Sequence, residues 1–312
     1  MIMMTKKIIR LSIFFDTILL IVVSIFFYLS IPIRSSSVIY MPQGSIKGII
    51  TYLSKNNFDI NGFDRYILRV MGKPQSGWID IRETELAKGD FLYRLTKSKA
   101  ALKDITLIPG ETMYFFIRDA SNIFGLKESD LWEAYKRYAP FPDGVILPDT
   151  YKLPLGISAN YLMQYLVARS MDKHKELAIK VLGRFDEKQW FRYITLASIV
   201  QKEAANKKEM PIVAAVIYNR IKIGMPLQMD GALNYGQYSH TKVTPERIKK
   251  DTTPYNTYKY RGIPPYPVGS VSMDAILAVI NPADVKYLYF VKTKNGDHVF
   301  SSTYQQHLKN IR

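Results

Sequence analysis

The chain opens with one long apolar run before any amphipathic pattern begins. Residues 11–33 are apolar apart from Ser, Thr, Tyr, Pro and one Asp. A run of this length can span a bilayer as a tilted helix. Lys6, Lys7 and Arg10 precede it. The positive-inside rule therefore predicts a cytoplasmic tail over residues 1–10, with the rest of the chain across the membrane.

A cleavable signal peptide is the alternative interpretation of this segment. Such a peptide has a shorter apolar region and a small-residue cleavage site after it. Here the run ends in Ile31-Pro32-Ile33-Arg34, which does not resemble such a site. The pattern favours an uncleaved anchor over residues 11–33. Asp16 lies near the cytoplasmic end of the run, where snorkelling or a helix partner can accommodate its carboxylate.

Short helical and strand-like patterns alternate from residue 36 to residue 108. Ser45 is a plausible N-cap for the first helix, and Gly72 closes the second. Strands are predicted at 38–41, 78–81 and 105–108, and helices at 46–53, 63–71 and from 92 onward. These elements predict a small α+β module over residues 36–108.

Residues 109–312 contain longer helical patterns and more turns. Helices are predicted at 114–123, 128–138, 159–182, 188–206, 211–223 and 273–280. Between them lie a Pro-rich loop at 140–151, an extended segment at 227–230 and a turn-rich stretch from 251. An Asn295-Gly296 turn joins two predicted strands at 286–291 and 297–300. The fold class predicted for the whole chain is α+β, with one transmembrane helix, a small module and a larger mixed helix/strand domain.

One carboxylate lies on the apolar face of the predicted 188–206 helix. Leu196 and Val200 lie on one helical stripe, and Glu203 continues that stripe at i+7. An apolar setting raises the pKa of a carboxyl, and an acid that stays protonated near neutral pH can act as a general acid. Glu203 is therefore the first catalytic candidate. The alternative is a structural glutamate paired with one of the lysines nearby in sequence.

Further polar residues recur at positions where they can face a cleft. Asn219 continues the apolar position of Ile212 at i+7 on the next helix, and a polar group there needs a hydrogen-bond partner. It is either a satisfied structural residue or an orienting residue beside Glu203. Gln228 and Asp230 alternate on one side of the predicted extended segment. They face either a cleft together or solvent at an exposed edge.

The stretch from 251 to 267 is rich in Tyr, Thr, Asn and Pro. Aromatic faces beside amides and hydroxyls suit sugar rings, since C–H faces stack on them while sugar hydroxyls form hydrogen bonds. Tyr residues also pack the cores of ordinary loops, and composition alone leaves both interpretations open. The residues concerned are Tyr255, Asn256, Tyr258, Tyr260 and Tyr266.

Composition narrows the classes of partner and of chemistry. The chain has 43 Lys and Arg against 27 Asp and Glu, a formal net charge of +16, which implies an anionic partner. Nucleic acid fits poorly with a membrane-anchored, exported body, and the sequence has no zinc-finger spacing or RRM-like motif. Without Cys there is no disulfide, thiol nucleophile or Cys-ligated metal. The four His lack metal-ligand spacing, and no G-x-S-x-G, P-loop or G-x-G-x-x-G motif occurs. We therefore expect no metal and no cofactor.

Several motifs, taken in order, closely resemble those of the YceG-like endolytic murein transglycosylase family. The resemblance covers the chain from about residue 38 to its end. The matching segments are Pro148-Asp149-Thr150-Tyr151, residues 196–200 with Glu203-Ala204, Asn219-Arg220, Gly224 to Gln228 with Asp230, Tyr255-Asn256-Thr257-Tyr258, Gly262-Ile263-Pro264-Pro265 and Asn281-Pro282.

The resemblance implies a LysM-like module over residues 36–108 and a catalytic domain over 109–312. It implies that Glu203 is the catalytic acid/base, and that Asn219, Gln228, Asp230 and the Tyr255–Tyr258 turn line a glycan cleft. It also implies an inner-membrane protein with a periplasmic catalytic body and partners in the cell-wall synthesis machinery. The chain departs from the family pattern at Gln201, often Glu in the family, at Asp230-Gly231-Ala232, usually Asp-Pro-[Ser/Thr], and at Asp143-Gly144, usually Glu-Gly.

The resemblance implies cleavage of the MurNAc–GlcNAc β-1,4 bond of peptidoglycan. Glu203 would protonate the glycosidic oxygen and then deprotonate the MurNAc C6 hydroxyl, which closes on C1 to leave a 1,6-anhydro end. Two other classes stay open. A muramidase would use Asp230 as a second carboxylate, and a membrane-anchored scaffold would bind peptidoglycan without cleaving it.

Overall fold

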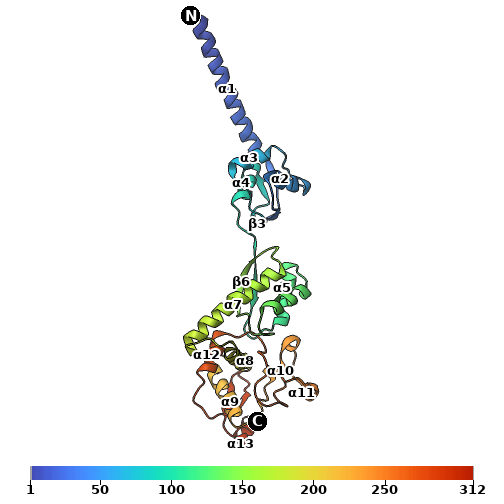
Figure 1. Cartoon of the computed structure of the whole chain (residues 1–312), viewed down its shortest axis with the longest axis vertical. Helices are drawn as coiled ribbons and strands as arrows, with labels where there is room; N and C mark the ends of the chain where they lie inside the picture. The colour runs from blue at the N-terminus through green and yellow to red at the C-terminus, as the bar shows by residue number, and fades with distance from the viewer. Residues whose placement is uncertain (1, 312) are drawn as a thin grey trace. The chain divides into compact units, whose positions relative to one another are not determined.

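The structure is a computed structural model that describes residues 2–311, with the side chains of residues 2–8 outside the description. Met1, the first residue of the predicted cytoplasmic tail, and Arg312, the last of the predicted catalytic domain, lie outside the described residues. The chain forms two compact units. One contains the chain up to Lys103 with Pro154–Gly156, and the other contains Asp104–Leu153 with the chain from Ile157 onward. Figure 1 labels several elements of each unit.

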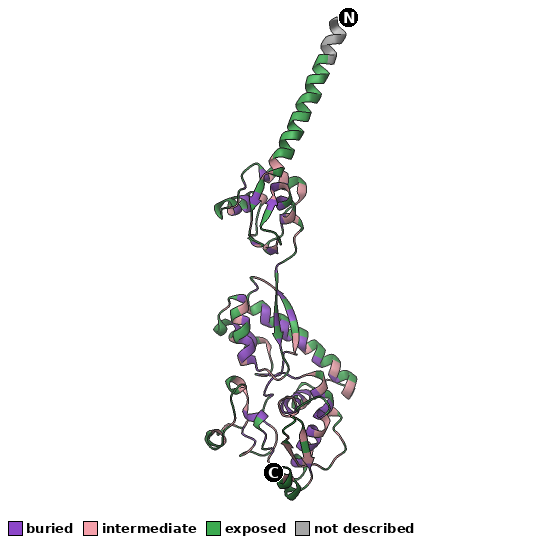
Figure 2. Ribbon diagram, turned by 180° about the vertical axis from the view of Figure 1, so that it is seen from behind, coloured by how far each residue is buried: buried purple, intermediate pink, exposed green. Residues whose placement is uncertain are grey.

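The first unit begins with the long helix α1 (Ile2–Ser30). Its segment Ile9–Ser30 is long and apolar enough to cross a membrane, and none of that segment is buried within the protein (Figure 2). The helix ends earlier than the apolar run. Pro32 and Ile33 enter strand β1 (Pro32–Arg34), where Ile33 is buried. Apolar content alone could not separate Ile33, a core residue of the unit, from the residues of α1.

Two antiparallel strand pairs and three short helices complete the first unit. Strand β1 pairs with β4 (Glu85–Ala87), and β2 (Val38–Met41) pairs with β3 (Gly77–Asp80). Between β2 and β3 lie α2 (Ile46–Lys55) and α3 (Asp64–Met71), and α4 (Lys88–Lys97) follows β4. As predicted, Ser45 caps α2 by accepting a hydrogen bond from the Gly48 N–H at 3.2 Å. Helix α4 begins four residues before the predicted Leu92, since strand β4 leads directly into it.

The core of the first unit is aliphatic with one buried Phe. Ile49 and Leu53 of α2 and Leu68 of α3 are almost fully buried against Ile79 and Phe91. The β–α–α–β order of β2, α2, α3 and β3 follows from alternating strand patterns on either side of two amphipathic helices. The mixed α+β class predicted for the chain is confirmed by these elements and by those of the second unit.

The second unit is mainly helical, with two small two-stranded sheets. Strand β5 (Leu102–Leu107) pairs with β6 (Asp149–Pro154), and β7 (Tyr289–Lys292) pairs with β8 (His298–Ser301). The helices are α5 (Met113–Phe124), α6 (Glu128–Tyr138), α7 (Ala159–Leu182), α8 (Glu187–Glu203), α9 (Met210–Lys222), α10 (Asp230–Leu233), α11 (Pro245–Lys250), α12 (Met273–Ile280) and α13 (Tyr304–Ile311), with a 3₁₀ turn η1 at Gly236–Tyr238.

Helices α8, α9 and α12 pack against one another and form the centre of this unit. Trp190 of α8 is fully buried, and its indole N–H donates to His174 Nδ1 at 3.0 Å. The other ring nitrogen of His174 lies 3.0 Å from the Val145 carbonyl oxygen. Burial lowers the pKa of His174 to about 4, so the ring is neutral at pH 7 and donates from Nε2. This chain of contacts ties the 143–146 loop to α7 and α8.

Several predicted elements differ from the observed ones. Helix α8 ends at Glu203 instead of residue 206, and strand β7 begins at Tyr289 instead of Lys286. The extended segment predicted at 227–230 is wrong. Gln228 has a φ of 48°, in the left-handed region, and α10 begins at Asp230. Contacts from distant residues, described below, hold this segment in place of strand pairing.

Candidate active site

Helix α8 carries the candidate acid at its last residue. The helix starts at an Asp186 cap, whose side chain accepts a hydrogen bond from the Gln189 N–H at 2.7 Å. Leu196 and Val200 are buried on the stripe that the sequence pattern predicted. Glu203 continues that stripe at the C-terminal end and is partly buried. The helix therefore holds one carboxyl at the margin of the core.

One backbone N–H holds the Glu203 carboxyl in place. The Gly231 N–H donates to Glu203 Oε1 at 2.6 Å, a length typical of a strong, charge-assisted hydrogen bond. Gly231 is the second residue of α10 and is buried. A Cβ at this position would lie 2.8 Å from Glu203 Oε1 and 2.9 Å from Lys202 Cβ. In this chain a Cβ at residue 231 would therefore displace the Glu203 carboxyl or α10, and glycine permits their close approach.

The surroundings raise the pKa of Glu203 to about 7. Desolvation by burial is the largest cause, because it disfavours the charged carboxylate. The nearby Asp230 carboxylate raises the pKa further, whereas the Gly231 N–H and the Arg220 guanidinium lower it. Near neutral pH the group is thus present in both protonated and ionised forms. A carboxyl in this state can donate a proton and later accept one.

Asp230 and Tyr258 form a second pair beside Glu203. The Tyr258 hydroxyl donates to Asp230 Oδ1 at 2.7 Å. Burial and this carboxylate raise the pKa of Tyr258 well above its usual value, so the phenol keeps its proton. Asp230 is exposed, and Tyr258 is half-buried.

Thr257 fixes the 227–230 segment against the 255–258 turn. The Gln228 N–H donates to the Thr257 carbonyl oxygen at 3.0 Å, and the Met229 N–H donates to Thr257 Oγ1 at 3.1 Å. Gln228 itself is exposed. These bonds replace the strand pairing that the sequence suggested. They hold Asp230 and Tyr258 together, and both lie close enough to Glu203 for their charges to interact with it.

Two other predicted residues, Asn219 and Asn256, have mainly internal contacts. The Asn219 amide donates to the carbonyl oxygens of Val285 and Tyr287, at 2.8 and 3.0 Å. It thereby holds the segment before β7 against α9. The Asn256 side chain is fully buried. Its amide donates to the Ile248 and Asp251 carbonyl oxygens at 2.8 Å each.

Tyr255 connects the site to a neighbouring pocket. Its ring stacks on Tyr235, with the ring centroids 4.2 Å apart. Tyr235, Tyr238, Arg247 and Asp251 line a pocket of about 510 Å³. The Arg247 guanidinium lies 4.4 Å from the Tyr238 ring centroid. An aromatic and polar lining of this kind suits a sugar ring.

The sequence patterns alone do not identify three further residues near the site, Lys202, Asp143 and Arg220. Lys202 Nζ donates to the Asn234 carbonyl oxygen at 2.7 Å and to Ser239 Oγ at 2.8 Å, and burial lowers its pKa to about 8. Burial raises the pKa of Asp143 to about 7, although the Met113 and Gly144 N–H groups donate to it.

Arg220 is buried and bonds to two carbonyl oxygens, those of Leu288 and Leu227. The sequence signal for Arg220 is weak, since a basic residue near a helix C-terminus is usually exposed.

Gln201 faces a different neighbour from Glu203. Its side-chain oxygen accepts a hydrogen bond from the Ser272 N–H at 3.1 Å, at the start of α12. A residue two positions before Glu203 points away from it on a helix. Among residues 2–311, no group of three or more His, Cys, Asp or Glu side chains is arranged to hold a metal ion.

Comparisons with known proteins bear on the family and the fold of this chain. The model of the YceG-like family matches residues 39–312. The crystal structure of a YceG-like protein from Listeria monocytogenes superposes with a TM-score of 0.58 and 23% identity. The superposition covers 89% of this chain and 99% of that one. At this identity the likeness shows a shared fold.

Two relatives are named endolytic murein transglycosylase. The protein of Bacillus subtilis is 36% identical over 118 residues, which are 38% of this chain and 33% of the relative. The protein of Streptococcus pneumoniae strain R6 is 31% identical over 175 residues, 54% of this chain and 31% of the relative. The matches thus span about a third of the length of each relative.

Proposed function

Because the chain belongs to the YceG-like family, we propose that it is an endolytic lytic transglycosylase of peptidoglycan. It cleaves the MurNAc–GlcNAc β-1,4 bond within glycan strands and leaves 1,6-anhydroMurNAc ends, in cell-wall assembly or glycan-chain termination. The names of the two relatives support the activity and the substrate. The observation that carries the proposal is Glu203, a carboxyl with a pKa of about 7 held by the Gly231 N–H.

Glu203 acts first as an acid and then as a base. Its protonated form donates to the glycosidic oxygen while an oxocarbenium-like centre develops at C1 of MurNAc. The resulting carboxylate takes the proton of the MurNAc C6 hydroxyl, whose oxygen then bonds to C1. One carboxylate suffices because the nucleophile already belongs to the substrate. Well-oriented intramolecular groups reach effective molarities of roughly 10⁵–10⁸ M, which favours ring closure over attack by water.

The residues around Glu203 divide between substrate contact and support. Gln228 and Asp230 are exposed and Tyr258 is half-buried, so their polar groups are available to sugar hydroxyls. Tyr255 extends the contact surface toward the pocket lined by Tyr235. Asn219 and Asn256, which the resemblance assigned to the glycan cleft, act here as positioning residues, because their amides bond to backbone carbonyls.

A muramidase is the second candidate function, and Asp230 is the observation that favours it. Asp230 is near enough to Glu203 to raise its pKa, and it is exposed. Hydrolysis through a second carboxylate requires such a group as base or nucleophile. The Tyr258 hydroxyl already donates to Asp230 Oδ1, however, so one oxygen of this carboxylate is engaged before any substrate binds.

The same proposal covers location and domain organisation. We assign residues 1–10 to the cytoplasm and the body to the periplasm. Of the predicted 11–33 anchor, we assign the helical part up to Ser30 to the inner membrane. Residues 36–108 form a LysM-like module, supported by the β–α–α–β order of β2, α2, α3 and β3. Residues 109–312 form the catalytic domain. Proteins of cell-wall synthesis are the expected partners.

Digestion of purified glycan strands in heavy-oxygen water tests the reaction class. A lytic transglycosylase gives products that carry no label and are lighter by one water than reducing-end fragments. A muramidase gives reducing ends that carry one heavy oxygen. If no fragments form under conditions where the full chain binds glycan, the chain is a non-catalytic scaffold and the proposal is wrong.

A further inference from the structure

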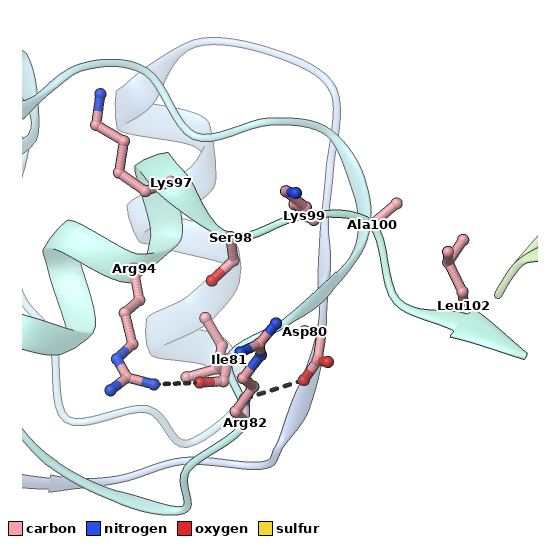
Figure 3. Close-up of a pocket in the computed structure, with 9 residues that line it drawn as sticks. All are labelled: Asp80, Ile81, Arg82, Arg94, Lys97, Ser98, Lys99, Ala100 and Leu102. Carbon is pink, nitrogen blue, oxygen red and sulfur yellow. Dashed lines mark hydrogen bonds between the residues drawn. The ribbon is translucent and has the colours of Figure 1, made fainter.

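The first unit contains a basic pocket that the proposed cleavage reaction does not use. The pocket has a volume of about 570 Å³ and lies where the end of α4 meets the end of β3. Its charged and hydroxyl side chains are those of Arg82, Arg94, Lys97, Lys99, Asp80 and Ser98 (Figure 3). Four cationic side chains and one carboxylate therefore line the pocket.

Arg94 is fixed at one wall of this pocket. One guanidinium nitrogen donates to the Ile81 carbonyl oxygen at 2.7 Å, and the other donates to Glu83 Oε1 at 2.6 Å (Figure 3). Its planar group is thus oriented before any ligand arrives, which lowers the entropy cost of binding. No ion pair is found for Arg82, Lys97 or Lys99 within the described part of the chain.

Arg82 has an unusual backbone conformation. Its φ of 70° lies in the left-handed region, which non-glycine residues adopt at a cost in free energy. The Arg82 N–H donates to the Ser37 carbonyl oxygen at 3.2 Å and to Asp80 Oδ1 at 3.0 Å. The second bond engages one oxygen of the only carboxylate that lines the pocket. Glycine or asparagine would adopt this turn more easily, so the backbone conformation itself does not call for an arginine at this position.

We propose that this pocket binds the phosphate groups of an anionic polymer. Guanidinium groups match the oxygens of phosphate in geometry, and ammonium groups add charge. The whole unit favours such a ligand, since residues 31–103 contain twelve Lys or Arg against six Asp or Glu. The proposal is independent of the cleavage reaction and holds whether or not Glu203 is catalytic.

The position of the pocket favours a polymer over a lipid headgroup. Gly89, at the start of α4, approaches Leu29 in the last turn of α1, with 3.2 Å between the Leu29 Cβ and a Cβ built on the glycine. Lys97 lies eight residues further along α4, about 12 Å away at 1.5 Å per residue. The headgroup layer is only roughly 5–8 Å thick. The pocket therefore lies at the end of α4 remote from its contact with α1, and on this ground we favour a polymer over a lipid headgroup.

Binding of a synthetic glycerol-phosphate oligomer to the full chain in neutral detergent tests this proposal. The variant Arg82→Gly removes the guanidinium and suits the left-handed backbone. We expect it to weaken binding roughly fivefold in calorimetry, the effect of losing one exposed ionic contact, without lowering the melting temperature. The matched control Lys73→Gln removes one exposed charge in the segment between α3 and β3, outside the residues that line the pocket, and should change the affinity less than twofold.

Three results would overturn the assignment. Equal weakening by Lys73→Gln would mean that binding follows overall charge, and equal affinity of the wild type for polyglutamate would mean that phosphate is not selected. The third would be a melting temperature that phosphatidylglycerol in mixed micelles raises for the wild type and not for Arg82→Gly. That result would assign the pocket to a lipid headgroup.

Discussion

The Glu203 carboxyl accepts a hydrogen bond from the Gly231 N–H at 2.6 Å, across 28 residues of sequence. This bond joins the last residue of α8 to the second residue of α10. It sets the direction of the carboxyl and opposes part of the pKa rise that burial causes. The position and the protonation of Glu203 therefore depend on a residue without a side chain.

Gly231→Ala should displace the Glu203 carboxyl. The new Cβ would lie 2.8 Å from Glu203 Oε1 and 2.9 Å from Lys202 Cβ, so α10 or the carboxyl must move. A shift of about 1 Å in a catalytic group can cost roughly 100-fold in rate. We expect a 10- to 100-fold loss of kcat/KM on glycan strands.

Gly62→Ala is the matched control for this change, because no atom lies within 4 Å of the added Cβ. It should leave kcat/KM unchanged. Unchanged activity in Gly231→Ala would show that this contact does not position the catalytic group.

Asp230→Asn should lower the pKa of Glu203, since the Asp230 charge raises it. An acid with a lower pKa loses its proton at lower pH. The alkaline limb of the rate profile should therefore move below its wild-type position near pH 7, while activity at pH 5 is largely retained. Initial rates from pH 5 to pH 9 measure the shift. Complete loss of activity at every pH would instead assign Asp230 to the chemistry, as a muramidase requires.

Glu203→Gln should make the protein less sensitive to rising pH. The pKa of Glu203 is raised in the folded state from 4.5 to about 7, so its contribution to stability is present below pH 4.5. It is lost as pH rises to about 7, because the unfolded chain ionises first. The loss is about 3 kcal/mol. Asp143 acts in both proteins and cancels in the comparison.

Thermal unfolding between pH 4 and pH 8 checks this difference. The melting temperature of Glu203→Gln relative to the wild type should rise across that interval and level off above about pH 7. A constant difference would mean that the Glu203 pKa is not raised.

Glu209→Gln should destabilise the protein at neutral pH. Desolvation raises the pKa of Glu209, but hydrogen bonds from His298 and Ala205 outweigh it and the net shift is downward. The carboxylate accepts from the His298 N–H at 2.9 Å and lies 2.7 Å from His298 Nδ1. We expect a loss of about 1–3 kcal/mol at pH 7.

The difference should shrink as pH falls below about 4.5, because the wild type loses this stabilisation once its own carboxylate is protonated. Chemical denaturation at pH 7 and pH 3 measures both values. A cost of the same size at both pH values would contradict the assignment.

Local patterns predicted most of the helices and the candidate acid. Helices α6 and α7 have the predicted bounds, since both have strong periodicity and clear ends. Gly296, with a φ of 95°, forms the predicted turn between β7 and β8. Glu203 was selected by periodicity because its place in the stripe depends only on residues within two turns of it.

The contacts that complete the site could not be predicted, because they join distant segments. The 227–230 segment is held by Thr257 and by Arg220, and neither bond has a periodic signature. The contacts of Lys202 could not be predicted either, since its partners Asn234 and Ser239 lie more than thirty residues away in the sequence. The Gly231 N–H is a backbone group, so its role as a hydrogen-bond donor cannot be recognised from the residue type. Hydrogen bonds between distant segments thus determine the conformation of residues 227–230, where the local sequence shows only alternating polar and apolar residues.

Mass analysis of glycan strands digested by the wild type, Glu203→Gln and Gln201→Glu tests the central claim most directly. Glu203→Gln keeps an oxygen that can accept the Gly231 N–H, whereas Gln201 contacts Ser272 and serves as the control position. We predict 1,6-anhydro fragments, each lighter by one water than a reducing-end product, from the wild type and Gln201→Glu. Glu203→Gln should give none. Anhydro fragments from Glu203→Gln at the wild-type rate would contradict the account.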